Sequence, residues 1–128
     1  MTLPRLSNHE MRIMEMLWAG GGLSVREIQE KFPAKSRPAY TTIQTVVKRL
    51  EAKQAVRRVG KIAAAFVFEA AIARNAARRR LIDEILAVFG GEAQPIMTHL
   101  IEAGQLTLEN VQEAEQYIRH HRKNGNKA

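Results

Sequence analysis

Hydrophobic residues recur at helical spacing along the first third of the chain, and the first two helices they predict have complete start signals. The first helix follows Ser7, a candidate N-cap with a glutamate three residues later, and ends at the glycine triplet 20–22. The second follows Ser24, which has a glutamate at the same spacing, and ends at Pro33. These signals predict two short helices that pack through their apolar faces.

A third helix is predicted to begin near residues 36–38 and to continue to about Lys53. The stripe that should face the core consists of Ile43, Val46, Val47 and Leu50. The opposite side carries small hydrogen-bonding groups and a cation, namely Thr41, Gln44, Thr45 and Lys48. A helix with these two faces is suited to the major groove of DNA, although an ordinary solvated face has a similar composition.

The spacing changes from helical to alternating after the third helix. Residues 55–59 and 65–68 predict two short strands, with Gly60 and Lys61 near their turn. Three helices followed by a β-hairpin form a winged helix-turn-helix, in which the hairpin can lie along the DNA backbone. The predicted fold class is therefore mainly α with a small β-hairpin.

The second half of the chain is predicted to be helical over residues 72–89, 95–103 and 107–123. Three short amphipathic helices have little to pack against alone, so we expect a partner subunit to cover them. The alternative is that they pack back on their own domain. The preferred interpretation divides the chain into a DNA-binding domain of residues 1–70 and a helical dimerisation domain of residues 71–128.

The candidate dimer contacts are the apolar positions of these later helices: Leu81, Ile82, Ile85, Leu86, Phe89, Ile96, Leu100, Ile101, Val111 and Ile118. The arginine run 78–80 lies beside them and could touch DNA at the edge of a binding site. We interpret it instead as a solvated face that pairs with Asp83 and Glu84 one turn later.

Charge is concentrated in the first half. Residues 33–61 contain eight Lys or Arg and one acid, so this segment alone carries +7 in a chain whose formal total is +7. With a sequence pI near 10.3, the charge indicates a polyanionic partner, either a nucleic acid or an anionic membrane surface. No apolar run approaches the length of a membrane span, and there is no signal-peptide core, so we expect a cytoplasmic protein.

Further candidate DNA contacts surround the third helix. Ser24 is first of all a helix cap, and it could also orient a phosphate at the N-terminus of the second helix. Tyr40 could either donate to a phosphate or pack beside the turn. The remaining candidates are basic residues in the turn and the hairpin that could bind phosphates: Arg37, Arg57, Arg58 and Lys61.

Catalytic and metal-binding motifs are missing from the sequence. It has no cysteine, no Gly-x-Ser-x-Gly and no His-Glu-x-x-His, and its four histidines have no metal-ligand spacing with a carboxylate. The glycine triplet lacks the Gly-Lys-Ser/Thr of a phosphate loop. We therefore predict no enzyme activity, no metal site and no cofactor.

The chain resembles the penicillinase-repressor family of winged-helix regulators (the BlaI/MecI/CopY type), strongly over residues 6–70 and more loosely to about residue 123. The most specific match is the run Tyr-Thr-Thr-Ile-Gln-Thr at residues 40–45. The resemblance implies a bacterial repressor that binds, as a homodimer formed by the helical arm, to a pseudo-palindromic operator with TACA/TGTA half-sites. By position, it places six residues in or beside the groove: Thr41, Thr42, Gln44, Thr45, Lys48 and Arg49.

Three departures from the family pattern bear on regulation. Where a membrane sensor protease cuts the antibiotic-resistance branch at an Asn-Phe bond, this chain has His99-Leu100, so cleavage control is either lost or has a different specificity. The copper-responsive branch uses a cysteine cluster, which this chain lacks. In the wing, Ala63-Ala64 replace the usual Gly-Arg, so the contact at the tip is either shifted to Lys61 or lost.

The sequence leads to one main functional hypothesis, a sequence-specific repressor bound to double-stranded operator DNA as a homodimer. Two alternatives come from other classes: a winged-helix module that binds RNA or protein, and an activator that senses a small ligand. A protein-binding face should carry apolar anchors, and the face of Thr41, Thr45 and Lys48 carries none.

Overall fold

The computed structural model describes residues 3–125. The three helices predicted for the first part of the chain are confirmed as α1 (Asn8–Gly20), α2 (Val25–Lys31) and α3 (Tyr40–Ala52). Both predicted capping boxes are present, because the hydroxyl groups of Ser7 and Ser24 each accept a hydrogen bond of 3.2 Å from the backbone N–H of the glutamate three residues later.

The start of α3 differs from the prediction. The helix begins at Tyr40, and the residues before it form a short 3-10 turn (Ala34–Ser36) followed by an extended segment. Arg37 precedes a proline, and a residue in that position is sterically disfavoured in a helix. The sequence pattern had placed Pro38 in the first turn of α3, but in the structure Pro38 precedes the helix.

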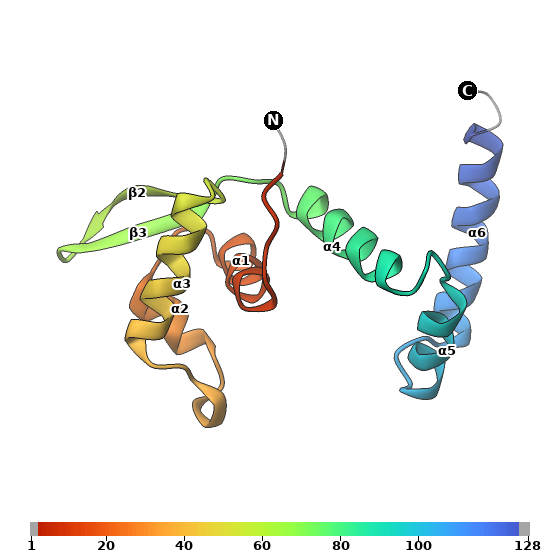
Figure 1. Cartoon of the computed structure of the whole chain (residues 1–128), viewed down its shortest axis with the longest axis horizontal. Coiled ribbons are helices and arrows are strands. Elements are labelled where there is room, and N and C mark those ends of the chain that lie inside the picture. The colour runs from red at the N-terminus through yellow and green to blue at the C-terminus, as the bar shows by residue number, and fades with distance from the viewer. Residues whose placement is uncertain (1–2, 126–128) are drawn as a thin grey trace. The chain divides into compact units, whose positions relative to one another are not determined.

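The sheet has three antiparallel strands in the order β1-β3-β2, one more strand than the predicted hairpin. The hairpin itself is confirmed as β2 (Val56–Ile62) and β3 (Ala65–Ala70) (Figure 1). The turn is not at Gly60 and Lys61 but at Ala63 and Ala64, where both residues have positive φ. Gly60 instead lies at a break in the strand register, with a φ of 157°. The extra strand, β1 (Leu23–Ser24), pairs with β3.

The hydrophobic core lies between the three helices and the base of the sheet. The fully buried side chains on α1 include Ile13 and Met14, which meet Ile28 of α2 and Leu50 of α3 in one cluster. Phe68 extends this cluster into β3. Because the apolar stripe of α3 is buried in this core, the opposite face of that helix remains at the surface.

The predicted helices of the second half are confirmed as α4 (Arg74–Val88), α5 (Gln94–Glu102) and α6 (Leu108–Gly125). No helix of residues 3–125 combines the length and the apolar character that a membrane span requires. The chain divides into two compact units, Met1–Asp83 and Glu84–Ala128. This division lies within α4, whereas the expected division lay at residue 70.

Contacts with α1 explain why the first unit includes the beginning of α4. The indole N–H of Trp18 donates to the carbonyl of Ile72 at 3.0 Å, and Ala77 is buried. Arg78 pairs bidentately with Glu15 of α1, at 2.7 Å for each hydrogen bond, a partner that the spacing along α4 had not suggested. This guanidinium holds the pKa of the Glu15 carboxyl below its usual value.

Candidate DNA-binding surface

The exposed face of α3 presents the predicted base-reading residues together. Residues Ile43, Val46 and Leu50 are buried in the core, so the side chains between them on the helix point outward. Thr41, Thr42, Thr45, Lys48 and Arg49 are exposed, and Gln44 is half-buried. This face thus combines amide, hydroxyl, methyl and cationic groups on a rigid element.

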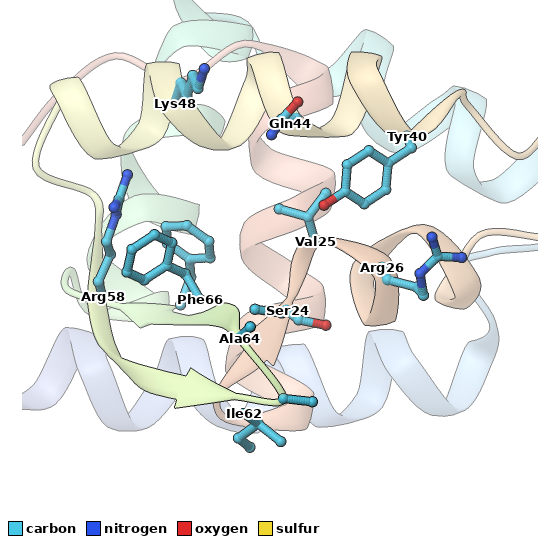
Figure 2. A pocket seen from close by; sticks show the side chains of 13 residues that line it. Ser24, Val25, Arg26, Tyr40, Gln44, Lys48, Arg58, Ile62, Ala64 and Phe66 are labelled. Carbon is cyan, nitrogen blue, oxygen red and sulfur yellow. The ribbon is translucent and has the colours of Figure 1, made fainter.

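A groove of about 530 Å³ separates this face from the hairpin. Tyr40, Gln44 and Lys48 line it from α3, and Arg58 and Phe66 line it from the hairpin (Figure 2). Figure 2 shows the polar ends of Gln44 and Lys48 on the same helix as Tyr40, with the Arg58 side chain extending towards that helix from the strand below. The structure therefore brings predicted recognition and wing residues to one surface.

Thr45 has a more restricted role than its residue type suggests. Its hydroxyl donates to the carbonyl of Thr41 at 2.9 Å, one turn earlier in α3. The hydroxyl hydrogen is therefore used within the helix. What Thr45 can offer to a base is its methyl group and the lone pairs of its oxygen.

The basic residues predicted to bind phosphates differ in how their side chains are held. Arg57 pairs with Glu69 of the adjacent strand at 2.6 Å, and Arg58 pairs with Glu51 of α3 at 2.7 Å. The Arg37 guanidinium donates to the carbonyls of Glu30 and Phe32 at 3.0 Å, where it closes the end of α2. Arg37 is thus an anchor of the turn before α3 as well as a candidate phosphate contact.

The N-terminus of α2 is already bonded to a carboxylate. Ser24 is buried, its hydroxyl caps the helix, and its backbone N–H donates to the Glu27 carboxylate at 2.9 Å. The hydrogen bond from the Ser24 backbone, followed by the one that involves its hydroxyl, holds the pKa of Glu27 below its usual value. A phosphate that approached Ser24 would therefore meet an ionised carboxylate.

Three residues of this surface are missing from the sequence-based prediction. The Arg26 guanidinium lies 5.6 Å from the ring centroid of Tyr40, so this cation of α2 belongs to the groove. Glu51 and Phe66 both contact Arg58. The position of Arg26 in the first turn of α2, one helix before α3, could have indicated it. The contact of Glu51 with Arg58 depends on how the hairpin meets α3, and the contact of Phe66 depends on the register of the two strands, which no local pattern encodes.

Within residues 3–125, no group of three or more His, Cys, Asp or Glu side chains is placed to hold a metal ion. The surface can instead offer hydrogen bonds to base edges from α3 and positive charge to phosphates from the hairpin.

Comparison with known proteins agrees with this geometry. The family model described as penicillinase repressor matches residues 6–120. The solution structure of the DNA-binding domain of the repressor BlaI matches with a TM-score of 0.50 and 26% identity, over 57% of this chain and 88% of that chain. A MarR family protein from Bacillus stearothermophilus has a TM-score of 0.48 and 18% identity, over 96% of this chain and 77% of that chain. No match is found among curated proteins. Since the family model spans most of the chain, the protein belongs to the penicillinase repressor family, whose members are winged-helix transcription regulators and not enzymes.

Proposed function

We propose that this DNA-binding repressor acts as a homodimer on a pseudo-palindromic operator, with one α3 helix in the major groove of each half-site. Membership of the penicillinase repressor family supports repression as the activity. A two-fold dimer would place its recognition helices about one DNA turn, ~34 Å, apart, or a multiple of that distance. The half-sites expected from the family resemblance are of the TACA/TGTA type.

The observation that carries this proposal is the exposed face of α3. Gln44 can bond adenine through two hydrogen bonds, Lys48 can reach guanine or a phosphate, and the Thr45 methyl suits thymine. Thr41, Thr42 and Arg49 extend the same exposed face. Lys61 of the hairpin is the candidate phosphate contact beside it.

Dimerisation through the helical arm is supported by exposed apolar surface. All ten apolar residues predicted as dimer contacts are at least partly exposed in the single chain, and Ile82, Ile101 and Ile118 are more than half exposed. In the second compact unit, α5 and α6 also line an apolar groove of about 600 Å³, which includes Leu100 and Val111. A second copy of the chain would remove this surface from water.

Control by a sensor protease would require a cut at His99-Leu100, the position that matches the family cleavage bond. The bond His99-Leu100 lies within α5, where backbone hydrogen bonds hold it in helical conformation. A protease would have to unwind this helix to cut there. The proposed function therefore covers operator binding and repression, and it assigns no route of release from DNA.

The test is a salt-titrated binding assay with a palindromic TACA/TGTA duplex and a scrambled duplex of equal length. We expect the palindrome to bind at least about 10³-fold more tightly, with two protomers per duplex. Gln44→Ala should lower the discrimination at one base pair by about 1–3 kcal/mol, whereas Gln112→Ala, on the exposed surface of α6, should not.

Equal affinity for both duplexes, with the same steep salt dependence, would mean that the basic half of the chain binds polyanions without sequence preference. Tighter binding to RNA than to duplex DNA would favour the RNA-binding alternative. A small molecule that increases operator affinity would favour the ligand-sensing alternative.

A further inference from the structure

Arg58 connects the hairpin to the C-terminal end of the recognition helix. Its Nε donates to one carboxylate oxygen of Glu51 at 2.7 Å, and its Nη2 donates to the other at 3.3 Å. The carboxylate therefore engages one side of the guanidinium in a bidentate pair. This contact links β2 to α3 across seven positions of sequence.

Aromatic rings of β3 hold the same guanidinium. It lies 4.1 Å from the ring centroid of Phe66 and 5.7 Å from that of Phe68, distances that suit a cation–π contact. Figure 2 shows the Arg58 side chain beside the Phe66 ring, below α3. Phe66 also lies 4.6 Å from the ammonium group of Lys61, so one ring contacts two cations of the hairpin.

The outer part of the hairpin has few other means of fixing its position. Val59 and Ile62 are exposed, and the register of the two strands shifts between Arg58 and Gly60. The core reaches only the base of the sheet, through Val56 and Phe68. The Arg58 contacts therefore lie where the buried part of the hairpin ends and the projecting part begins.

We propose that Arg58 braces the wing against the recognition helix, with Glu51 and Phe66 as positioning residues, so that Lys61 reaches the DNA backbone. This inference rests on the proposed function and assigns Arg58 a different role from the phosphate contact that its charge suggests. Its charge is already balanced by Glu51, and the pair instead sets the angle between α3 and the wing. The brace improves binding because it reduces the freedom that the wing would lose on DNA.

The test uses substitutions for which charge and positioning predict different changes in DNA affinity. Removing the acid with Glu51→Ala makes the DNA-facing surface more positive, so simple electrostatics predicts tighter binding. Arg58→Lys keeps the charge but loses the bidentate geometry, so electrostatics predicts no change. The brace predicts that each variant binds the palindromic duplex about threefold or more weakly, and that the double variant is no weaker than either single one.

The hairpin offers a matched control in the pair Arg57–Glu69. This pair joins β2 to β3 at 2.6 Å within the sheet and does not involve α3. Glu69→Ala should therefore bind slightly more tightly, as electrostatics predicts for the loss of an acid beside the DNA-facing surface. Thermal unfolding of each variant confirms that the comparison is made between folded proteins.

A second measurement tests whether the Arg58–Glu51 pair positions Lys61. Among the interactions described for residues 3–125, Lys61 has no contact with Glu51 itself. Lys61→Ala should weaken binding and lower the slope of log affinity against log salt by about one in the unsubstituted chain. In the Glu51→Ala background the same change should have little further effect. Lys61→Ala with an equal effect in both backgrounds would overturn the brace, as would tighter binding by Glu51→Ala.

These outcomes are distinct from failure of the proposed function. An unsubstituted chain that does not prefer the palindrome would refute operator recognition itself. A chain that prefers the palindrome, with a Glu51→Ala variant that binds it more tightly, would leave the repressor in place and return Arg58 to the role of an ordinary phosphate contact.

Discussion

At the scale of single residues, Glu10 is a charged side chain that is buried in the first unit. Its side chain is 3% exposed, and one carboxylate oxygen accepts hydrogen bonds from the Lys53 ammonium at 2.7 Å and the Ser7 backbone N–H at 2.8 Å. The other oxygen is buried, with no hydrogen-bond partner in the described part of the chain. Burial by itself raises the pKa of Glu10, but the Lys53 ammonium and the Ser7 donors outweigh it, so the pKa lies below 4.5.

The sign of the pH dependence follows from this lowered pKa. A carboxyl group that is more acidic in the folded than in the unfolded chain stabilises the fold once it is ionised. The contribution of Glu10 is therefore complete above about pH 4.5, its ordinary value, and is lost as the pH falls through the lower folded pKa.

Lys53→Met should destabilise the protein most at neutral pH. Without the ammonium, the ionised Glu10 carboxylate stays buried with less compensation, which should lower the free energy of unfolding by about 1–3 kcal/mol. Loss of the ammonium raises the pKa of Glu10 relative to the unsubstituted chain, so protonation at acidic pH relieves part of the deficit. Urea unfolding at pH 7 and pH 4 measures this difference. Lys35→Met, at an exposed position, should change little at either pH, and a Lys53→Met deficit that grew on acidification would contradict the explanation.

At the scale of elements, sequence reasoning succeeded where a local signal determined the structure. Two capping boxes fixed the starts of α1 and α2, and helical spacing identified the outward face of α3. The sequence did not predict β1, because a strand of two residues is too short to show any periodicity. It also misplaced the turn, because Gly60 is a strong turn signal whereas Ala63-Ala64 is none. The pairing of Arg58 with Glu51 required the hairpin to be placed against α3 first.

The alanine turn also stores backbone strain that can be measured. Ala63 and Ala64 have φ values of 51° and 65°, in the left-handed region where a Cβ is sterically unfavourable. The double substitution Ala63→Asn with Ala64→Gly introduces the Asn-Gly sequence that favours a two-residue hairpin turn with positive φ. It should raise the free energy of unfolding by about 1 kcal/mol.

Thermal or urea unfolding measures this gain, and the neighbouring strand provides the control. Ala65→Gly introduces the same flexible residue at the first position of β3, where no positive φ requires it, and should lower stability. If the turn substitution were as destabilising as Ala65→Gly, the backbone of Ala63 and Ala64 would not be strained in this turn.

At the scale of the whole molecule, the helical arm exposes apolar side chains that the proposed partner subunit would cover. The sequence predicted its helices because apolar residues recur at helical spacing, but the same spacing does not say whether the chain or a partner buries them. The structure leaves Ile118 60% exposed and Tyr117 71% exposed on α6. Exposure of this kind along several helices is unusual for a chain that remains a monomer.

Ile118→Glu should therefore convert the proposed homodimer to monomers and weaken operator binding. A charge in a buried apolar interface loses its hydration without gaining a partner, so the dimer should dissociate at concentrations where the unsubstituted chain remains paired. Sedimentation equilibrium measures the mass, and the duplex assay measures the loss of two-site binding. Gln116→Glu introduces the same charge two positions earlier on the same helix, on a different side, and should leave the mass unchanged. Monomers in the unsubstituted chain would refute dimerisation, whereas dissociation by both variants would mean that added charge anywhere on α6, and not burial of Ile118, controls assembly.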